Sequence, residues 1–373
     1  MHGCDQSCYC GQLFKQAKRT GDFTKYKRAR NRTLESLRLA KRRYLLQLNP
    51  KHPKQFWKTM KFLNRRSKSV PTLKNDSEVA CSSRDKANML DNFFANCFNT
   101  IFPPLSAPAT LPLSHPSEKI LCMEDEIFHL LSLLDVTKAG GPDGISPKML
   151  KYTAASIAPI ITKIFNLSII SSKIPLCWKQ AYVVPIQKTP DATSPSCYRP
   201  ISLIPVISKV LERHMSNLIM DYLYQNDLIC DHQWGFLEGR STVTALIKCT
   251  DDWFRALEQG QDVCAIYFDF RKAFDSVPHQ PLLQKISMLG LDDYLLTWVH
   301  NYLCERTQLV VVDGEKSDTV AVLSGVPQGS VLGPLLFLIY ISDLPNAITI
   351  TSAIVNLFAD DVLATISFCV KCK

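Results

Sequence analysis

The stretch Asn356-Leu357-Phe358-Ala359-Asp360-Asp361-Val362-Leu363 places two adjacent carboxylates between two apolar runs. Residues 348–357 carry no charge, and residues 362–370 are almost as apolar. This pattern predicts a β-hairpin with Asp360 and Asp361 at its turn. Two like charges this close repel each other unless a metal ion or a cationic side chain neutralises them. Aspartate is also a common turn residue that simply faces water, so the pair alone leaves both interpretations open.

A further carboxylate lies near the end of the apolar run Cys264-Ala265-Ile266-Tyr267-Phe268-Asp269-Phe270, which has the composition of a strand. An unpaired carboxylate is costly in apolar surroundings. We therefore expect Asp269 to have a strong partner, unless the strand ends in solvent at this residue. Another acid, Asp275, follows six residues later.

Farther along the chain, Ser324-Gly325-Val326-Pro327-Gln328-Gly329-Ser330 predicts a turn that leads into an apolar helix over 331–341. A turn of this kind either presents backbone N–H groups to an anionic or stacked ligand or is a plain helix entry.

A lysine and an arginine flank a predicted strand-loop-strand segment. The strand 181–186 is followed by Lys188, and a loop then leads to Tyr198-Arg199-Pro200-Ile201-Ser202-Leu203. Together the two cations form a plausible clamp for phosphate oxygens, because arginine can make a bidentate contact. Either residue alone is more often a surface charge.

Two glycine-rich connections are also present. Lys138-Ala139-Gly140-Gly141-Pro142-Asp143-Gly144-Ile145 predicts a turn whose glycines permit close backbone approach, or an ordinary tight connection. The segment 233–242, Gln-Trp-Gly-Phe-Leu-Glu-Gly-Arg-Ser-Thr, predicts a turn entering a helix over 242–257, with Ser241 or Thr242 as its cap.

The charge of the chain is unevenly distributed. The chain has 373 residues, 46% hydrophobic and 21% charged, which is typical of a globular protein and not of a disordered one. Residues 1–70 hold 19 Lys or Arg and three acids, whereas the remainder carries a net charge of −7. A basic arm on a mildly acidic body suggests contact with a polyanion, most commonly nucleic acid, although a solvated basic helix with no partner has the same composition.

The domain organisation follows from this change in composition. Residues 1–102 read as a basic helical N-terminal region, with helices over about 13–48, around Phe56 to Leu63, and over 85–102. Residues 103–117 are rich in Pro and Ser and predict a linker and the domain boundary. Residues 118–373 alternate between predicted helices and strands, so this part of the chain should contain both kinds of element.

The cysteines and the apolar runs indicate where in the cell the protein is expected. The 14 cysteines follow no regular framework, and the N-terminus lacks the apolar core of a secretory signal, so we expect reduced thiols in an intracellular protein of the nucleus, the cytoplasm or both. The run 331–341 is too short to cross a bilayer, so no membrane-spanning segment is expected.

These residues resemble a known family. Phe268-Asp269-Phe270-Arg271-Lys272-Ala273-Phe274-Asp275, the turn 325–330 and Phe358-Ala359-Asp360-Asp361 look like the three palm motifs of reverse transcriptases of non-LTR (LINE-type) retrotransposons, in the same order and spacing. Residues 140–145 resemble the additional N-terminal motif of that group, and residues 198–203 its fingers motif. The resemblance covers about residues 120–373, and residues 13–100 are more loosely similar to the basic linker that precedes the polymerase.

The resemblance implies a fold and a chemistry. It implies an α+β fold, with right-hand polymerase fingers over about 118–258 and a palm, an antiparallel sheet with packed helices, over about 259–373. Two Mg²⁺ ions would be held principally by Asp269 and Asp360 with support from Asp361, which fits the preference of Mg²⁺ for hard oxygen ligands. Asp275 would be a local hydrogen-bonding residue.

The resemblance also implies which residues bind the substrates. Lys188 and Arg199 would hold the triphosphate of an incoming deoxynucleotide, and Gln328 with Gly329 would lie against the nucleotide and template. Phe274 would lie beneath the sugar and exclude a ribose 2′-hydroxyl. The implied partners are an RNA template, a DNA primer and deoxynucleoside triphosphates.

Little sequence follows the two aspartates. Only twelve residues come after Asp361, so the sequence predicts that the thumb is missing, and the chain before residue 118 is too short for an endonuclease domain. The prediction is thus an RNA-directed DNA polymerase encoded by a truncated copy. The alternatives are a catalytically inactive nucleic-acid-binding remnant and a related group II intron-type maturase.

Overall fold

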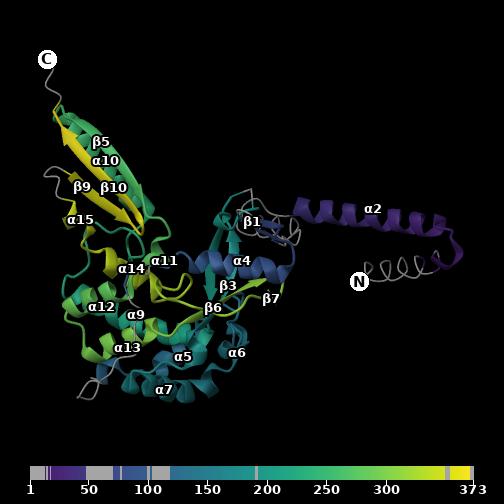
Figure 1. Cartoon of the computed structure of the whole chain (residues 1–373), viewed down its shortest axis with the longest axis horizontal. Coiled ribbons are helices and arrows are strands. Elements are labelled where there is room, and N and C mark those ends of the chain that lie inside the picture. Colours follow the sequence, from purple (N-terminus) through teal and green to yellow (C-terminus); the bar gives the residue numbers. More distant parts are fainter. Residues whose placement is uncertain are drawn as a thin grey trace. The chain divides into compact units, whose positions relative to one another are not determined.

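The computed structural model describes residues 13, 16, 18–47, 70–75, 78–98, 101–102, 118–189, 192–348 and 353–369 (Figure 1). The chain divides into the units Met1–Lys68 and Ser69–Lys373. In the first unit, α2 (Thr24–Gln47) contains nine Lys or Arg and one acid, Glu35. Asp22 begins this helix by accepting the Thr24 N–H at 2.9 Å. A basic helix is therefore present in the expected range, and the second helix expected around Phe56 to Leu63 lies outside the described residues.

The second unit begins with a small hairpin and a helix, which the sequence had placed in the N-terminal region. These elements are β1 (Leu73–Asn75), β2 (Glu78–Ala80) and α4 (Ser83–Ala95). The buried side chains of Leu73, Leu90 and Phe94 pack in one cluster with Val183 and Val310. The division of the chain therefore falls before residue 69 and not at 103–117, because the apolar face of α4 is buried against strands of the following domain. Residues 103–117 themselves lie outside the described residues.

A larger sheet has the strand order β4-β3-β6-β7, with β8 beside β6. Its strands are β3 (Gln180–Gln187), β4 (Tyr198–Leu203), β6 (Thr307–Val312), β7 (Glu315–Lys316) and β8 (Val320–Ala321). Strand β3 pairs antiparallel with β4 and parallel with β6. The sheet thus joins strands from both sides of residue 258, where the sequence had separated fingers from palm.

Helices form the main hydrophobic core next to this sheet (Figure 1). Trp298 and Tyr302 are almost completely buried in it, with their rings stacked at 5.7 Å. Such aromatic pairs add to the stabilisation that burial alone provides. The helices in and around this core are α5 (Glu124–Ser132), α6 (Pro147–Tyr152), α7 (Ala154–Ser171), α8 (Leu176–Lys179), α9 (Val206–Gln225), α11 (Ala273–Ser276), α12 (His279–Met288), α13 (Asp293–Leu303), α14 (Gly333–Ile341) and α15 (Leu344–Ala347). Short 3₁₀ turns cover Glu118–Ile120 and Pro195–Cys197.

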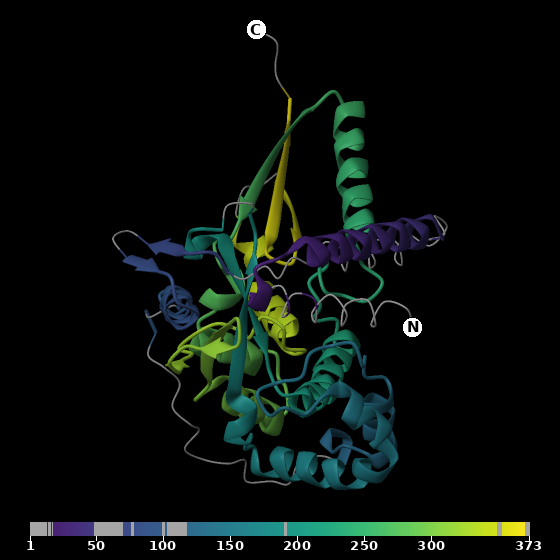
Figure 2. The same cartoon turned by 90° about the vertical axis from the view of Figure 1, so that its right-hand side faces the viewer.

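A smaller antiparallel sheet has the order β5-β10-β9, formed by β5 (Asp262–Asp269), β9 (Ala353–Phe358) and β10 (Asp361–Phe368). The hairpin predicted around Asp360 and Asp361 is present. Helix α10 (Thr242–Glu258) begins at the Ser241 cap and lies beside these strands, to which it is tied by a 3.2 Å hydrogen bond from Trp253 Nε1 to Thr365 Oγ1 (Figure 2). Side chains Val355, Leu357, Val362 and Ala364 are buried on one face of the sheet.

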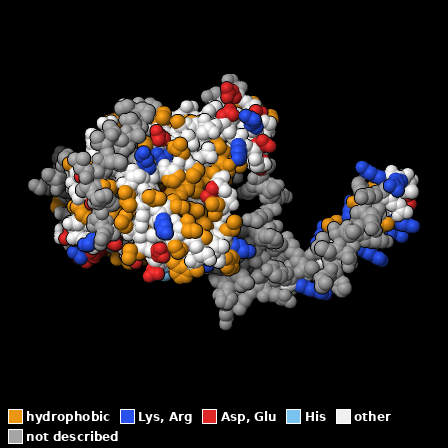
Figure 3. All heavy atoms as spheres, turned by 90° about the horizontal axis from the view of Figure 1, so that it is seen from below, with side chains coloured by type: hydrophobic (Ala, Val, Ile, Leu, Met, Phe, Trp, Pro, Cys, Tyr) orange, Lys and Arg blue, Asp and Glu red, His pale blue; other side chains and the backbone are white. Residues whose placement is uncertain are grey.

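Helix α7 combines a buried and an exposed apolar face. In the described part of the chain, α7 is the helix that is long enough and apolar enough to cross a bilayer. The core helix of a soluble protein passes the same test. Helix α7 buries Phe165 and Ile169 in the main core, whereas Ile160 and Leu167 are exposed. Figure 3 shows hydrophobic side chains gathered on the surface seen from below, where α7 lies. The expected lack of a membrane-spanning segment stays a prediction.

Candidate active site

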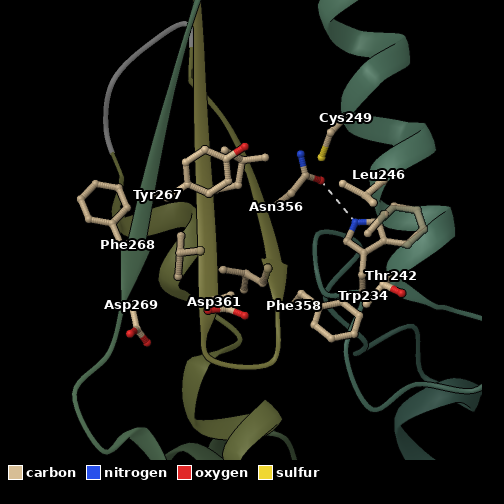
Figure 4. A pocket seen from close by; sticks show the side chains of 14 residues that line it. Trp234, Thr242, Leu246, Cys249, Tyr267, Phe268, Asp269, Asn356, Phe358 and Asp361 are labelled. Carbon is tan, nitrogen blue, oxygen red and sulfur yellow. Dashed lines mark hydrogen bonds between the residues drawn. The ribbon is translucent and has the colours of Figure 1, made fainter. Parts of the chain in front are cut away.

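The acidic turn connects β9 to β10. Strand β9 ends at Phe358 and β10 begins at Asp361, so the turn consists of Ala359 and Asp360. Ala359 has a φ of +57°, in the left-handed region that side chains other than glycine rarely adopt. In the register of β10 with β5, Asp361 lies directly opposite Asp269. Side chains opposite each other in an antiparallel pair share one face of the sheet, and both carboxylates border the same cavity (Figure 4).

The carboxylates lie in a more open setting than the sequence suggested. Strand β5 is mostly exposed, and Asp269 and Asp361 are exposed, while Asp360 is half-buried. Of the two interpretations that the sequence left open for Asp269, the exposure of its carboxylate favours a strand that ends in solvent. Partial burial and the charges of Asp360 and Asp269 raise the pKa of Asp361.

The donor set fits a magnesium ion chemically. In the described part of the chain, no three His, Cys, Asp or Glu side chains already stand close enough to enclose a metal ion. However, Asp269 and Asp361 are register partners on the adjacent strands β5 and β10, and two like charges at such positions repel each other. A cation between them would relieve this repulsion, and carboxylate oxygens are the ligands that Mg²⁺ prefers. The register pairs Asp269 with Asp361, so the expected ranking of Asp360 above Asp361 as a ligand stays a prediction.

Positive side chains gather near these carboxylates. Arg199 on β4 pairs with Ile186 on β3, and Lys188 follows two residues later, so both cations lie at one end of this strand pair. Partial burial lowers the pKa of Lys188, and the positive charges of Arg199 and Lys272 lower it further, opposed by Asp275 and Asp269. The expected pair is therefore one part of a mixed cluster. Lys272 was missed as a member, although it lies only three residues after Asp269.

The turn 325–330 packs against backbone on two sides. The Ser202 N–H donates to the Gln328 carbonyl at 2.7 Å, and a Cβ on Gly329 would lie 2.7 Å from the Ser202 carbonyl oxygen. On the other side, the Val326 N–H donates to the Phe274 carbonyl at 2.9 Å. The turn thus connects β4, which carries Arg199, to α11, which follows Asp269.

Of the two interpretations of this turn, the plain helix entry fits the N–H groups nearest the helix, because these groups already have acceptors within the chain. Glu212 Oε2 accepts the Val331 N–H at 2.8 Å and the Leu332 N–H at 3.3 Å. Ser330 Oγ accepts the Gly333 N–H at 2.9 Å. The sequence did not single out Glu212, because a glutamate within a helical pattern usually faces solvent.

The Phe274 ring is fixed between two other aromatic rings. It stacks on Phe337 with ring centroids 4.7 Å apart and meets Phe236 edge-on at 6.0 Å. Phe274 is half-buried, so one part of the ring remains accessible. Its position is set by packing and is therefore well defined for contact with a ligand.

In the segment 140–145, Gly141 allows the backbone to approach another backbone segment of the same chain closely. A Cβ on Gly141 would lie 2.6 Å from the Cα atom and the nitrogen of Pro205. Pro205 follows β4 and caps α9. The prediction of close approach is confirmed, and the approached group is the backbone that connects β4 to α9.

An open cavity of about 460 Å³ borders the acidic turn (Figure 4). Its walls are mostly apolar and come from α10, from the segment before it and from all strands of the smaller sheet. Trp234 Nε1 donates to Asn356 Oδ1 at 3.3 Å across this wall. The lining residues are Trp234, Thr242, Ala245, Leu246, Cys249, Tyr267, Phe268, Asp269, Asn356, Leu357, Phe358, Asp361, Val362 and Leu363.

Part of the chain matches a known protein family. Residues 186–370 match the family "Reverse transcriptase (RNA-dependent DNA polymerase)". The chain belongs to the reverse transcriptases of non-LTR retrotransposons. It is 31% identical over 326 residues to a Drosophila melanogaster protein named "Probable RNA-directed DNA polymerase from transposon BS", a match that covers 82% of this chain and 35% of that protein.

Other relatives of this reverse transcriptase domain come from the same fly. The "RNA-directed DNA polymerase from mobile element jockey" is 30% identical over 321 residues, covering 80% of this chain and 34% of that protein. The "Probable RNA-directed DNA polymerase from transposon X-element" is 34% identical over 243 residues, covering 64% and 27%. The chain thus spans about a third of the length of these relatives. Its mixed α+β fold is consistent with the fingers and palm of a reverse transcriptase.

Proposed function

We propose that this chain carries the nucleotidyl-transfer centre of an RNA-directed DNA polymerase, which extends a DNA primer on an RNA template with deoxynucleoside triphosphates. The observation that carries the proposal is the β5–β10 register, which sets Asp361 opposite Asp269 next to the turn that holds Asp360. The family relationship supports the reaction type. In this proposal the smaller sheet belongs to the palm and the β3–β4 pair to the fingers.

Each part of the centre has its own role. Asp269, Asp360 and Asp361 would hold two magnesium ions. Bound there, the ions would activate the primer 3′-hydroxyl and neutralise the departing pyrophosphate. Lys188 and Arg199 would bind the triphosphate oxygens through charge-assisted hydrogen bonds, and their position close to Asp269 supports this role.

The remaining residues would orient the nucleotide. Gln328 and Gly329 lie in the turn packed on Ser202 and would contact the nucleotide and template. Phe274, held by its aromatic neighbours, would lie under the sugar and collide with a 2′-hydroxyl. We therefore expect Phe274→Ala to lower the preference for dNTP over rNTP, measured as the ratio of kcat/KM values. An unchanged ratio would place the ring elsewhere.

Primer extension on an RNA template with dNTP and Mg²⁺ tests the central proposal. Asp269→Asn and Asp360→Asn should lower kcat at least about a hundredfold, since each removes charge that stabilises the transferring group by several kcal/mol. Asp262→Asn is the matched control, because this exposed acid lies at the opposite end of β5. Absence of extension by the wild-type chain, or equal rates for all variants, would reject the proposal.

Helix α2 supports a second, compatible role in nucleic-acid binding. Its nine cations and single acid favour contact with phosphates, which would contribute affinity without sequence preference. Deleting residues 13–68 should weaken RNA binding and flatten its dependence on salt concentration. Binding that is unchanged in affinity and in salt dependence would show that α2 makes no phosphate contacts.

A further inference from the structure

The segment before α10 runs along β9 next to the acidic turn. The Trp234 N–H donates to the Leu357 carbonyl at 2.8 Å, and the Leu357 N–H donates to the His232 carbonyl at 2.8 Å. These bonds form a parallel bridge between Gln233 and Leu357. A Cβ on Gly235 would lie 2.4 Å from the Ala359 nitrogen, so only glycine fits at this position. The segment therefore touches the backbone that connects β9 to Asp360.

The Gln233 side chain bonds both backbone groups of Ala359. It is 3% exposed. Its Oε1 accepts the Ala359 N–H at 2.9 Å and the Gly235 N–H at 2.8 Å, and its Nε2 donates to the Ala359 carbonyl at 3.4 Å. Two N–H groups need an acceptor here and one carbonyl needs a donor, so a primary amide satisfies all three.

This contact explains how the turn keeps its conformation. Ala359 is a non-glycine residue with φ of +57°, a conformation that persists only when its surroundings hold it. Gln233 fixes both peptide groups that flank the Ala359 Cα atom. The direction in which the chain leaves Ala359 determines where the Asp360 carboxylate lies.

We propose that Gln233 is a positioning residue for the two-aspartate turn. It acts through Ala359, which it holds in the left-handed conformation, and thereby sets Asp360 relative to Asp361 and Asp269. The proposal rests on the proposed polymerase function for its effect on catalysis, whereas the hold on the turn is a property of the fold.

Amide hydrogen exchange tests the hold on the turn without reference to activity. Gln233→Met keeps the side-chain volume but removes the amide. Exchange at Ala359 and Gly235 should then become roughly tenfold faster or more, because both N–H groups lose their acceptor. Leu357 should stay within about twofold, because its partner is a backbone carbonyl. Equal exchange at Ala359 in wild type and variant, or an equal rise at Leu357, overturns the proposal.

The conservative variant Gln233→Glu refines this test. An ionised glutamate keeps an oxygen for the two N–H groups, but it loses the donor to the Ala359 carbonyl and adds a negative charge there. Gly235 should therefore stay protected. Gln225→Met is the matched control, since Gln225 is exposed at the end of α9 and its substitution should leave exchange at Ala359 unchanged.

Steady-state kinetics test the consequence for catalysis. Gln233→Met should lower kcat about tenfold and raise the Mg²⁺ concentration for half-maximal rate. KM for dNTP should stay within about twofold, because the proposed triphosphate contacts, Lys188 and Arg199, lie just after β3 and on β4. A wild-type kcat, or a loss expressed only in KM, overturns the proposal. In a chain without polymerase activity the proposed function fails, and hydrogen exchange alone still decides whether Gln233 holds the turn.

Discussion

Glu212 joins the core to the turn that precedes α14, so its replacement should destabilise the domain strongly. The side chain is 0% exposed and is bonded through both oxygens. Oε2 accepts the N–H groups of Val331 and Leu332, and Oε1 accepts the Ser208 hydroxyl at 3.2 Å. Burial raises the pKa of Glu212, while the nearby Arg306 guanidinium and these N–H groups oppose that rise.

The expected magnitude follows from these contacts. In Glu212→Ala the N–H groups of half-buried Val331 and buried Leu332 lose their acceptor. A buried donor left without an acceptor costs about 1–3 kcal/mol, so the loss of both hydrogen bonds should cost about 2–6 kcal/mol. Glu212→Gln keeps the shape and one oxygen for Val331, so we expect a loss of about 1–3 kcal/mol. A domain with a total stability of about 5–15 kcal/mol would survive the second change but only marginally the first.

Urea unfolding of the full chain measures both variants. Asp221→Ala, which removes an exposed carboxylate on the same helix, is the control and should change stability by less than about 0.5 kcal/mol. A loss below about 1 kcal/mol for Glu212→Ala would refute the reasoning. Equal losses for the alanine and glutamine variants would show that packing, and not hydrogen bonding, is what Glu212 contributes.

Other predictions concern stability and substrate binding. Burial raises the pKa of Asp275 from 3.8 to about 6, against the attraction of nearby lysines. The folded state therefore binds the proton more tightly than the unfolded state, and its stability should fall by up to about 3 kcal/mol as pH rises from 4 to 7. Urea titrations at each pH should show that Asp275→Asn removes this pH dependence. Gly141→Ala should cost about 1–3 kcal/mol in the same assay, because its Cβ meets the Pro205 backbone; an unaffected variant would contradict the close approach. Ser241→Ala should cost about 1 kcal/mol through loss of the α10 capping box, and no change would show that the cap contributes nothing. Arg199→Lys should raise KM for dNTP about tenfold with little change in kcat, since lysine lacks the bidentate fork; a fall in kcat alone would argue against triphosphate binding.

Local sequence patterns were sufficient to predict much of the fold. The apolar runs on either side of Asp360 and Asp361 predicted the β9–β10 hairpin, and a cap at Ser241 or Thr242 predicted the start of α10. These features depend on neighbouring residues and on turn chemistry, which a sequence displays directly. By contrast, β1, β2 and α4 were assigned to the wrong side of the domain boundary, because their partners Val183 and Val310 are distant in the chain.

The sequence by itself determined the order of the motifs, the family and the acidic hairpin, because these depend on residue types and spacing. Only the tertiary structure decided that Asp361 lies opposite Asp269 and that Glu212 occupies the N–H groups ahead of α14. It also decided that Gln233 bonds Ala359. These contacts join segments that are far apart in the chain. Packing between such segments sets the register of a strand and the partner of a buried side chain, so local sequence periodicity does not predict them.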